Sequence, residues 1–379
     1  MDAPLVPQDE LLFFQPHYQQ LHQKRLDAIT SMEMTLTNEL VAKGNIMNAS
    51  ELAKLQNSLW LVKRLKGLSG STIATVVGLN DWQTPYDLWL EYTMKKEHSQ
   101  VQTAAQEWGH RLEPVIAQKY ADQLGCQLME VGLQQCRDYP FLLGSLDRAV
   151  LDADGKPCKV LEIKTAAANH ATQETDEDGT AIKAWGSGNV YHSDGSLAIQ
   201  DSQVPKQYIM QVMCYMIVTG LRQADVAVLM NTNTFRIFTV DFDADIARMM
   251  IKAADRFWCQ NVLDEVPPIM KEEDTKVLEV EKDKAIEANS DIESALTELK
   301  EVQLNIKDLS QREKELRDQV LGFMGNAAKL TANGKCLATY TMCKGRESFN
   351  SKRFSLEYPE LYASYMEQGP SYRRFVIKK

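Results

Sequence analysis

The stretch GSLDRAVLDADGKPCKVLEIKTA, residues 144–166, most limits what this chain can fold into. Two β-rich runs, LDRAVLD and CKVLEIK, flank Asp154 and Gly155, a pair that suits the positive φ angles of a tight hairpin turn. We therefore expect an antiparallel hairpin. With this pair at the turn centre and no bulge, the numbers of paired residues sum to 309, which places Asp147 opposite Glu162.

Side chains alternate between the two faces of a strand, so Glu162 and Lys164 share one face and Leu161 and Ile163 the other. Asp147 then converges with Glu162 and Lys164. Two carboxylates so close repel each other, and one must bind a proton unless a divalent cation neutralises both. Because Mg²⁺ favours carboxylate oxygens, the hairpin predicts a metal site. The alternative is a surface hairpin with an ordinary Glu162–Lys164 pair, although the apolar neighbours favour a buried strand.

Four segments are predicted along the chain. Residues 1–60 have apolar positions at helical spacing and predict a helical N-terminal extension. Residues 61–268 interleave helices with β-rich runs and predict an α/β core. Residues 269–325 contain almost no helix breakers and predict a long charged helix or helical hairpin, with short coiled-coil pairing as the sharper alternative. Residues 326–379 form a basic, aromatic tail. The expected core strands are 127–134, 146–152, 158–164, 224–230 and 234–241.

Composition excludes several classes of protein. The 379 residues, 44% of them hydrophobic, suffice for at least one large core. No apolar window approaches membrane-span length, and the start MDAPLVPQDE lacks the order of a secretory signal, so we expect a soluble, cytoplasmic protein without a membrane partner. The seven cysteines have neither a CxxC pair nor zinc-finger spacing, which indicates reduced, structural thiols.

The formal net charge of -10 is unevenly distributed. Residues 271–320 hold 9 Lys and Arg against 15 Asp and Glu, whereas residues 326–379 hold 10 against 4. The basic end suits either DNA phosphates or a neighbouring subunit, and the sequence does not separate these two. Its basic residues include Lys344, Arg346, Lys352, Arg353, Arg373, Arg374, Lys378 and Lys379.

Asp147, a turn and then Glu162-x-Lys164 resemble the core of PD-(D/E)xK nucleases, with Ser-Leu-Asp in place of Pro-Asp. Further segments, in the same order, resemble the lambda exonuclease-like (YqaJ-type) phage recombination nucleases over residues 60–268. This resemblance implies a central mixed β-sheet flanked by helices. The segments are RLKGLSGS from Arg64 to Ser71 with VVGLNDWQTPYDLW after it, GHRLEP around Glu113 with Tyr120, and VPKQYIMQ from Val204 to Gln211.

The resemblance implies a role for each matching residue at the metal site. Asp147 and Glu162 would hold the metal, with the backbone carbonyl of Ile163 as a further ligand and Glu113 completing the environment. Lys164 would orient or activate the attacking water. Gln211 would position the site through hydrogen bonds. Without the resemblance, a surface helix residue is the ordinary interpretation of Glu113 and a satisfied core amide that of Gln211.

Four residues are predicted to bind DNA. Arg64 and Ser71 match the residues that hold the 5′-phosphate, and their chemistry suits an anion because Arg64 has a planar fork and Ser71 begins an expected helix over 71–78. A solvated basic patch and a plain helix cap are the alternatives. Tyr208 lies in a matching helix, and Trp185 belongs to a long insert between Lys164 and Pro205. Trp185, with Tyr191, could stack on bases or pack within its own loop.

The function implied by the resemblance is that of a phage or prophage enzyme in a bacterial host. We expect an exonuclease with one or two Mg²⁺ ions, replaceable by Mn²⁺, that degrades the 5′-ended strand of linear duplex DNA. Its products would be 5′-phosphomononucleotides and 3′ overhangs for recombination. A ring-shaped oligomer, for example a trimer, and a single-strand annealing protein are the expected partners.

Two alternatives remain beside this function. One is an endonuclease or single-strand-specific nuclease on the same core, and another is a catalytically silent DNA-end-binding protein. A Cas4-type nuclease lacks the clustered cysteines that its iron–sulfur cluster needs.

Overall fold

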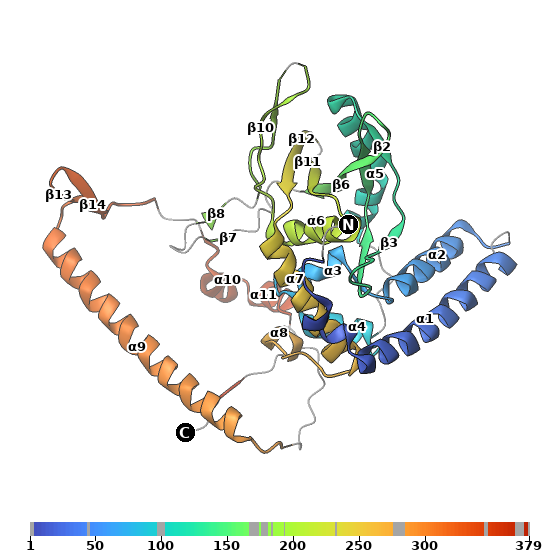
Figure 1. Cartoon of the computed structure of the whole chain (residues 1–379). Coiled ribbons are helices and arrows are strands. Elements are labelled where there is room, and N and C mark those ends of the chain that lie inside the picture. Colours follow the sequence, from blue (N-terminus) through green and yellow to red (C-terminus); the bar gives the residue numbers. More distant parts are fainter. Residues whose placement is uncertain are drawn as a thin grey trace. The chain divides into compact units, whose positions relative to one another are not determined.

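The computed structural model divides the chain into two compact units, residues 1–275 and 276–379 (Figure 1). No helix within the described residues combines the length and the apolar character needed to cross a membrane. The structure describes residues 4–43, 46–96, 103–166, 174–175, 181–182, 185–192, 194–231, 233–275, 285–344, 348–367 and 375–377.

The first unit is built on a mixed five-stranded sheet in the order β12-β11-β6-β5-β2. The pairing of β11 with β6 is parallel and the other three pairings are antiparallel. Helices cover the sheet, so the expected α/β architecture with a central mixed sheet is confirmed. The strands are β2 (Gln127–Met129), β5 (Arg148–Leu151), β6 (Pro157–Ala166), β11 (Gln223–Met230) and β12 (Thr234–Asp241).

A second, smaller sheet has the order β1-β4-β3. The predicted strand over 127–134 is divided, because β2 joins the large sheet whereas β3 joins the small one. Strand β4 was not predicted, since its four residues, LLGS, are too few to show a period and include a glycine. The small sheet consists of β1 (Leu68–Ser69), β3 (Leu133–Gln135) and β4 (Leu142–Ser145), and further two-stranded pairs are β7 (Glu174–Thr175) with β8 (Ala181–Ile182) and β9 (Val190–Tyr191) with β10 (Leu197–Ile199).

Helix α5 (Ala104–Leu124) packs on the sheet face that carries Leu161 and Ile163. Its Tyr120 hydroxyl donates to Asp225 Oδ2 on β11 at 2.6 Å. Asp225 is fully buried, and it also binds Lys159 Nζ at 3.0 Å and the Thr239 hydroxyl at 2.6 Å. The buried charge is therefore satisfied from three elements, which fixes the helix on the sheet.

Helix α6 (Lys206–Thr219) is the central helix of the larger core, with seven consecutive buried residues from Met210 to Met216. It packs on α3 (Gly70–Val76), β4 and α7 (Ala244–Arg256), while a π-helical turn, Phe257–Leu263, extends α7. The other helices of this unit are α1 (Pro16–Lys43), α2 (Ala49–Arg64), α4 (Pro85–Tyr92) and α8 (Glu272–Thr275), with 3-10 turns at Gln8–Glu10 and Leu12–Phe14.

The β5–β6 hairpin has the predicted register, but its turn and its strand β6 both differ from the prediction. Residues 148, 149 and 150 pair with 161, 160 and 159, so their numbers sum to 309. However, the turn is one residue longer than expected, since Leu151 pairs with Pro157. A bulge at Cys158 adds one residue to β6 and restores the sum, so the expectation of a bulge-free hairpin is wrong.

The second unit contains one long helix, α9 (Ser290–Met324), rather than a helical hairpin. Strands β13 (Lys329–Ala332) and β14 (Lys335–Thr339) follow it and pair antiparallel. Their turn lies at Asn333 and Gly334, which have φ angles of 49° and 78°, as the ANGKC segment indicates. Two short helices follow in the described part of this unit, α10 (Ser351–Glu357) and α11 (Pro359–Ser364).

The contact between α3 and α6 leaves no room for a side chain at Gly70. A Cβ there would lie 2.4 Å from Tyr215 Cε1 and 3.0 Å from the Gln211 carbonyl oxygen. We predict that Gly70→Ala lowers the free energy of unfolding by roughly 1–3 kcal/mol, measured by urea denaturation. Gly132→Ala is the matched control, because nothing lies within 4 Å of its added carbon. Equal stability of the two variants would contradict this packing.

Candidate active site

Asp147 lies directly before β5, and its Oδ2 accepts a hydrogen bond from the Ile163 amide at 2.7 Å. The hairpin thus holds the aspartate across from Glu162, as the sequence predicts. Burial, followed by repulsion from Glu162, raises the pKa of Asp147 to about 8. Asp147 therefore keeps its proton more readily than an exposed aspartate does.

Glu162 is 1% exposed, in the middle of β6. Its Oε1 accepts from Gln211 Nε2 at 2.7 Å and from Lys164 Nζ. Its Oε2 has no hydrogen-bond partner, which is true of no other buried side-chain oxygen or nitrogen in the part of the chain described. Burial raises the pKa of this carboxyl against the opposing effect of Lys164. Buried polar atoms normally have a hydrogen-bond partner, so this unpartnered oxygen indicates a position where a ligand would bind.

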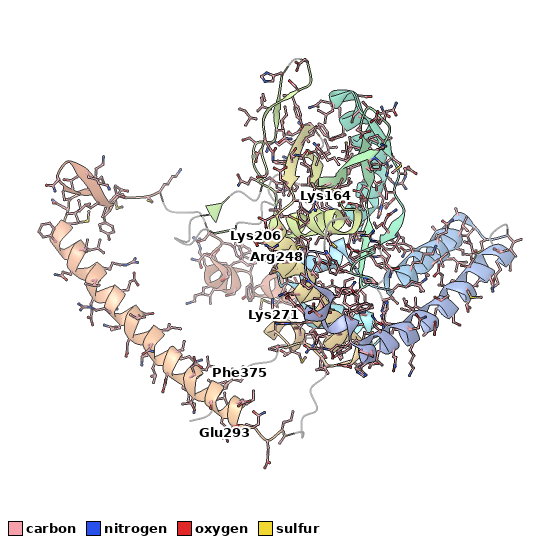
Figure 2. The ribbon with its side chains drawn as sticks, viewed as in Figure 1. Lys164, Lys206, Arg248, Lys271, Glu293 and Phe375 are labelled. Carbon is pink, nitrogen blue, oxygen red and sulfur yellow. The ribbon has the colours of Figure 1, made fainter. Side chains whose placement is uncertain are left out.

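Lys164 leans over the Tyr208 ring, with Nζ 4.9 Å from the ring centroid. Figure 2 marks its position on β6, inside the first unit. Although burial lowers the pKa of Lys164, the Glu162 and Asp147 carboxylates outweigh that effect and raise it. The side chain is therefore an ammonium group held against the acids.

The donor set fits a divalent cation. Asp147 and the unpartnered Glu162 oxygen are hard ligands, and a cation between them would remove both the repulsion and the missing contact. The described residues nevertheless contain no group of three His, Cys, Asp or Glu side chains already placed to hold a metal. Glu113, the third predicted acid, is the residue that the structure leaves out of such a group.

Arg148, which sequence reasoning missed, holds Glu113. Its Nη1 donates to Glu113 Oε1 at 2.9 Å and to the Asp147 carbonyl oxygen, and Nη2 lies 3.3 Å from Glu130 Oε1. This arginine is only 16% exposed, so it neutralises Glu113 at the edge of the acidic pair. The sequence did hold a signal for this contact. Arg148 follows Asp147 directly, and because side chains alternate along a strand, the Arg148 side chain points toward α5, which carries Glu113, rather than toward α6.

Gln211 reaches the site from α6, as the hydrogen-bonding prediction requires. Its Nε2 donates to Glu162 Oε1 and also to the Tyr215 hydroxyl at 2.9 Å. Tyr215 lies one turn further along the same helix and is fully buried against α3. The glutamate is thus held in place by a helix that is itself fixed in the core.

Arg64 and Ser71 come together, seven residues apart, at the start of α3. Arg64 Nη2 donates to the Ser71 hydroxyl and to the Ser69 hydroxyl, and its guanidinium lies 4.4 Å from the Trp60 ring centroid. Ser69 was not predicted. It is the N-cap residue, and the helix runs from Gly70 to Val76, so the expectation that Ser71 begins a helix over 71–78 is wrong.

One layer of residues connects the arginine–serine cluster (Arg64, Ser69 and Ser71) to the acidic pair (Asp147 and Glu162). Gly70 packs on the Tyr215 ring, and Tyr215 shares the Gln211 amide with Glu162. The pKa of Tyr215 is raised by burial and then by Glu162, while Arg64 opposes the rise. Arg64 and Glu162 therefore shift the pKa of the same hydroxyl in opposite directions.

The prediction that Trp185 stacks on DNA is wrong. Trp185 is 9% exposed and packs between Tyr208 and Phe238, with ring centroids 5.5 and 5.4 Å away. Its indole lies in the core because Trp185 itself packs against α6 and β12. Tyr191 is half-buried and accepts from Asn189 Nδ2 at 3.0 Å. Of the predicted basic tail, Arg346, Arg373, Arg374, Lys378 and Lys379 lie outside the described residues.

Residues 59–222 match the family model of the YqaJ-like viral recombinase domain, and this range includes every predicted site residue from Arg64 to Gln211. This part of the chain is therefore similar to the YqaJ-like viral recombinase domain. A relative, the uncharacterised protein YqaJ of Bacillus subtilis (strain 168), is 26% identical over 362 residues, which cover 90% of this chain and 98% of the relative. The likeness therefore extends beyond the recombinase domain on both sides.

Solved structures with a similar chain path include nucleases. The alkaline exonuclease LHK-Exo of Laribacter hongkongensis is 19% identical, with a TM-score of 0.38, over 54% of this chain and 92% of that chain. A phage-related exonuclease of Haemophilus somnus 129PT is 12% identical, with a TM-score of 0.34, over 53% of this chain and 96% of that chain.

The raised pKa of Asp147 makes the stability of the metal-free first unit depend on pH. Its contribution is favourable while the carboxyl keeps its proton, and it is lost as the pH rises from the ordinary value of 3.8 through about 8. We predict that Asp147→Asn gains roughly 1–3 kcal/mol over the wild type between pH 5 and pH 8, with no further gain above. Urea denaturation in EDTA measures this.

Asp154→Asn, in the exposed turn of the same hairpin, is the control for the pH series. Its stability should follow the wild type at every pH. Parallel curves for Asp147→Asn and Asp154→Asn would mean that Asp147 is not strained by its neighbours.

Proposed function

We propose that this chain is a Mg²⁺-dependent exonuclease that degrades the 5′-ended strand of linear duplex DNA. It would release 5′-phosphomononucleotides and leave 3′ overhangs for phage-type recombination by strand annealing, in the cytoplasm of a bacterial host. The observation that carries the proposal is the unpartnered, buried oxygen of Glu162, a carboxyl that raises the pKa of Asp147, within the residues that match a viral recombinase domain. The coarser assignment, a nuclease, rests on that domain together with the acidic pair.

Phosphodiester hydrolysis needs an activated water and stabilisation of the charge that develops on phosphorus, and one or two bound Mg²⁺ ions supply both. Asp147 and Glu162 would hold the ion, with the Ile163 carbonyl as a further ligand and Mn²⁺ as a substitute. Glu113 would also bind the ion, through Oε2, because in the described contacts Arg148 binds Oε1. Lys164, as an ammonium group, would orient the attacking water and offset the charge of the phosphate.

A second group of residues would select the DNA end. Arg64 is held by Ser69 and Ser71 at the first turn of α3, so its remaining donors are fixed in direction. A planar guanidinium beside two hydroxyls is suited to a terminal phosphate. The single layer formed by Gly70 and Tyr215 joins this group to Glu162, which supports cleavage one nucleotide from a bound 5′ end.

We further propose a ring-shaped homo-oligomer, for example a trimer, and a single-strand annealing protein as partner. Closure of a ring around DNA would explain how a chain with a formal charge of -10 keeps its substrate, since topology rather than charge retains it. The competing function is an endonuclease on the same core. It requires no DNA end and therefore predicts cutting of closed circular DNA, whereas the exonuclease leaves circles intact.

Magnesium binding is testable without measuring activity. We predict that Mg²⁺ raises the melting temperature of the wild type at pH 8, because the ion relieves the repulsion between Asp147 and Glu162. Glu162→Gln should lose most of this shift, while Asp154→Asn in the turn should keep it. Differential scanning fluorimetry across a Mg²⁺ titration measures the shift. A full shift in Glu162→Gln would remove the acidic pair from the metal site.

Digestion of end-labelled linear duplexes tests polarity and end selection. The wild type should degrade from the 5′ end, faster with a 5′-phosphate than with a 5′-hydroxyl. Arg64→Gln should reduce this preference by roughly tenfold, because a charge-assisted contact of about 1.5–3 kcal/mol is lost. Lys63→Gln, at the exposed neighbouring position paired with Glu33, should retain it. Degradation from 3′ ends, or cutting of closed circles, would overturn the proposal.

A further inference from the structure

Helix α9 carries an apolar stripe that the other described residues of the second unit do not cover. The helix has 35 residues and is about 50 Å long, yet Met324 at its last turn is its one buried residue among those described. Ile306 and Leu309 in its middle are 58% and 68% exposed. Figure 1 shows the helix as a single unbroken rod.

The stripe has the period of a coiled coil. From Ile292 to Phe323, positions at alternating steps of three and four residues are apolar with one exception, Glu313. This 3.5-residue repeat is sustained over almost five heptads, more than an amphipathic surface helix shows. The a positions are Ile292, Leu299, Ile306, Glu313 and Val320, and the d positions are Ala295, Val302, Leu309, Leu316 and Phe323.

We propose that α9 pairs with α9 of a second copy of this chain as an antiparallel coiled coil centred between Ile306 and Leu309. In this register all ten core positions find a partner. Leu299 meets Leu316 of the second copy, Ile306 meets Leu309, and Glu313 meets Val302. The inference does not depend on the proposed nuclease function.

Charge decides both the partner and the direction. In the antiparallel arrangement Glu298 and Arg312 of the second copy lie on the same flank, about 7.5 Å apart along the axis, and by symmetry this attraction occurs twice. A parallel pair would instead place Glu313 against Glu313 in a core layer and Arg312 against Arg317 at the edge. Both of these contacts are repulsive.

The exceptional residue Glu313 is accommodated by the antiparallel arrangement. Its Oε1 lies 2.5 Å from Arg317 Nη2 of the same helix, so the carboxylate has a partner at the rim of the stripe. Arg317 is 67% exposed and is free to keep that contact when the apolar layers close. Glu293, labelled in Figure 2 near the start of the helix, lies outside the stripe.

Two leucines of α9 allow a test of whether the stripe itself, rather than any exposed apolar residue, holds the two copies together. In the full-length chain, Leu309→Lys, in the stripe, should halve the mass measured by light scattering. Leu304→Lys should leave the mass unchanged, because Leu304 is 60% exposed but lies on the opposite face. An unchanged melting transition of the first unit shows that this unit folds in both variants. A wild-type mass equal to that of Leu309→Lys, or an equal loss in Leu304→Lys, overturns the proposal.

Reversal of charge tests the direction of pairing. Arg312→Glu should weaken the antiparallel pair because it sets a second carboxylate on the same flank as Glu298, so the mass of this variant should fall toward that of Leu309→Lys. The combined Glu298→Arg and Arg312→Glu variant should restore the wild-type mass. In a parallel pair, Arg312→Glu would remove the repulsion from Arg317 and strengthen association, and that result would overturn the antiparallel arrangement.

Discussion

The buried carboxylate of Glu162 is the group on which the rest of the candidate site depends. Removing an ionised carboxylate from water costs several kcal/mol unless other groups compensate. Here Lys164 on the same strand and Gln211 on α6 satisfy one oxygen, while the other has no partner. A chain that kept this group for stability alone would do better with an apolar residue, so its retention points to a ligand.

The need to hold the buried Glu162 carboxylate in place is met by helices that are themselves packed in the core. Gln211 can orient Glu162 only if α6 keeps its position, and α6 is buried along two consecutive turns. The Gly70 contact then joins α6 to α3 and to the arginine–serine cluster. On the other face, the Asp225 network fixes α5 and with it Glu113. Each polar group of the candidate site is therefore positioned by a satisfied contact deeper in the core.

The two units differ in how their apolar residues are used. In the first unit, even an aromatic residue of the long insert, Trp185, is taken into the core beside Tyr208. In the second, the leucines and isoleucines of α9 remain exposed at coiled-coil spacing. An exposed stripe of that length has a large unfavourable contact with water, which a second copy of the helix would remove.

The sequence alone determined the hairpin, because alternation and the Asp154–Gly155 turn act over neighbouring residues. It also determined the face shared by Glu162 and Lys164, and the period of α9. The register was predicted correctly only because the longer turn and the Cys158 bulge cancel. Only the tertiary structure showed that Arg148 holds Glu113, that Ser69 joins Arg64, and that Trp185 is buried. These contacts join elements distant in sequence, and no local pattern encodes which side chains meet when helices pack on a sheet.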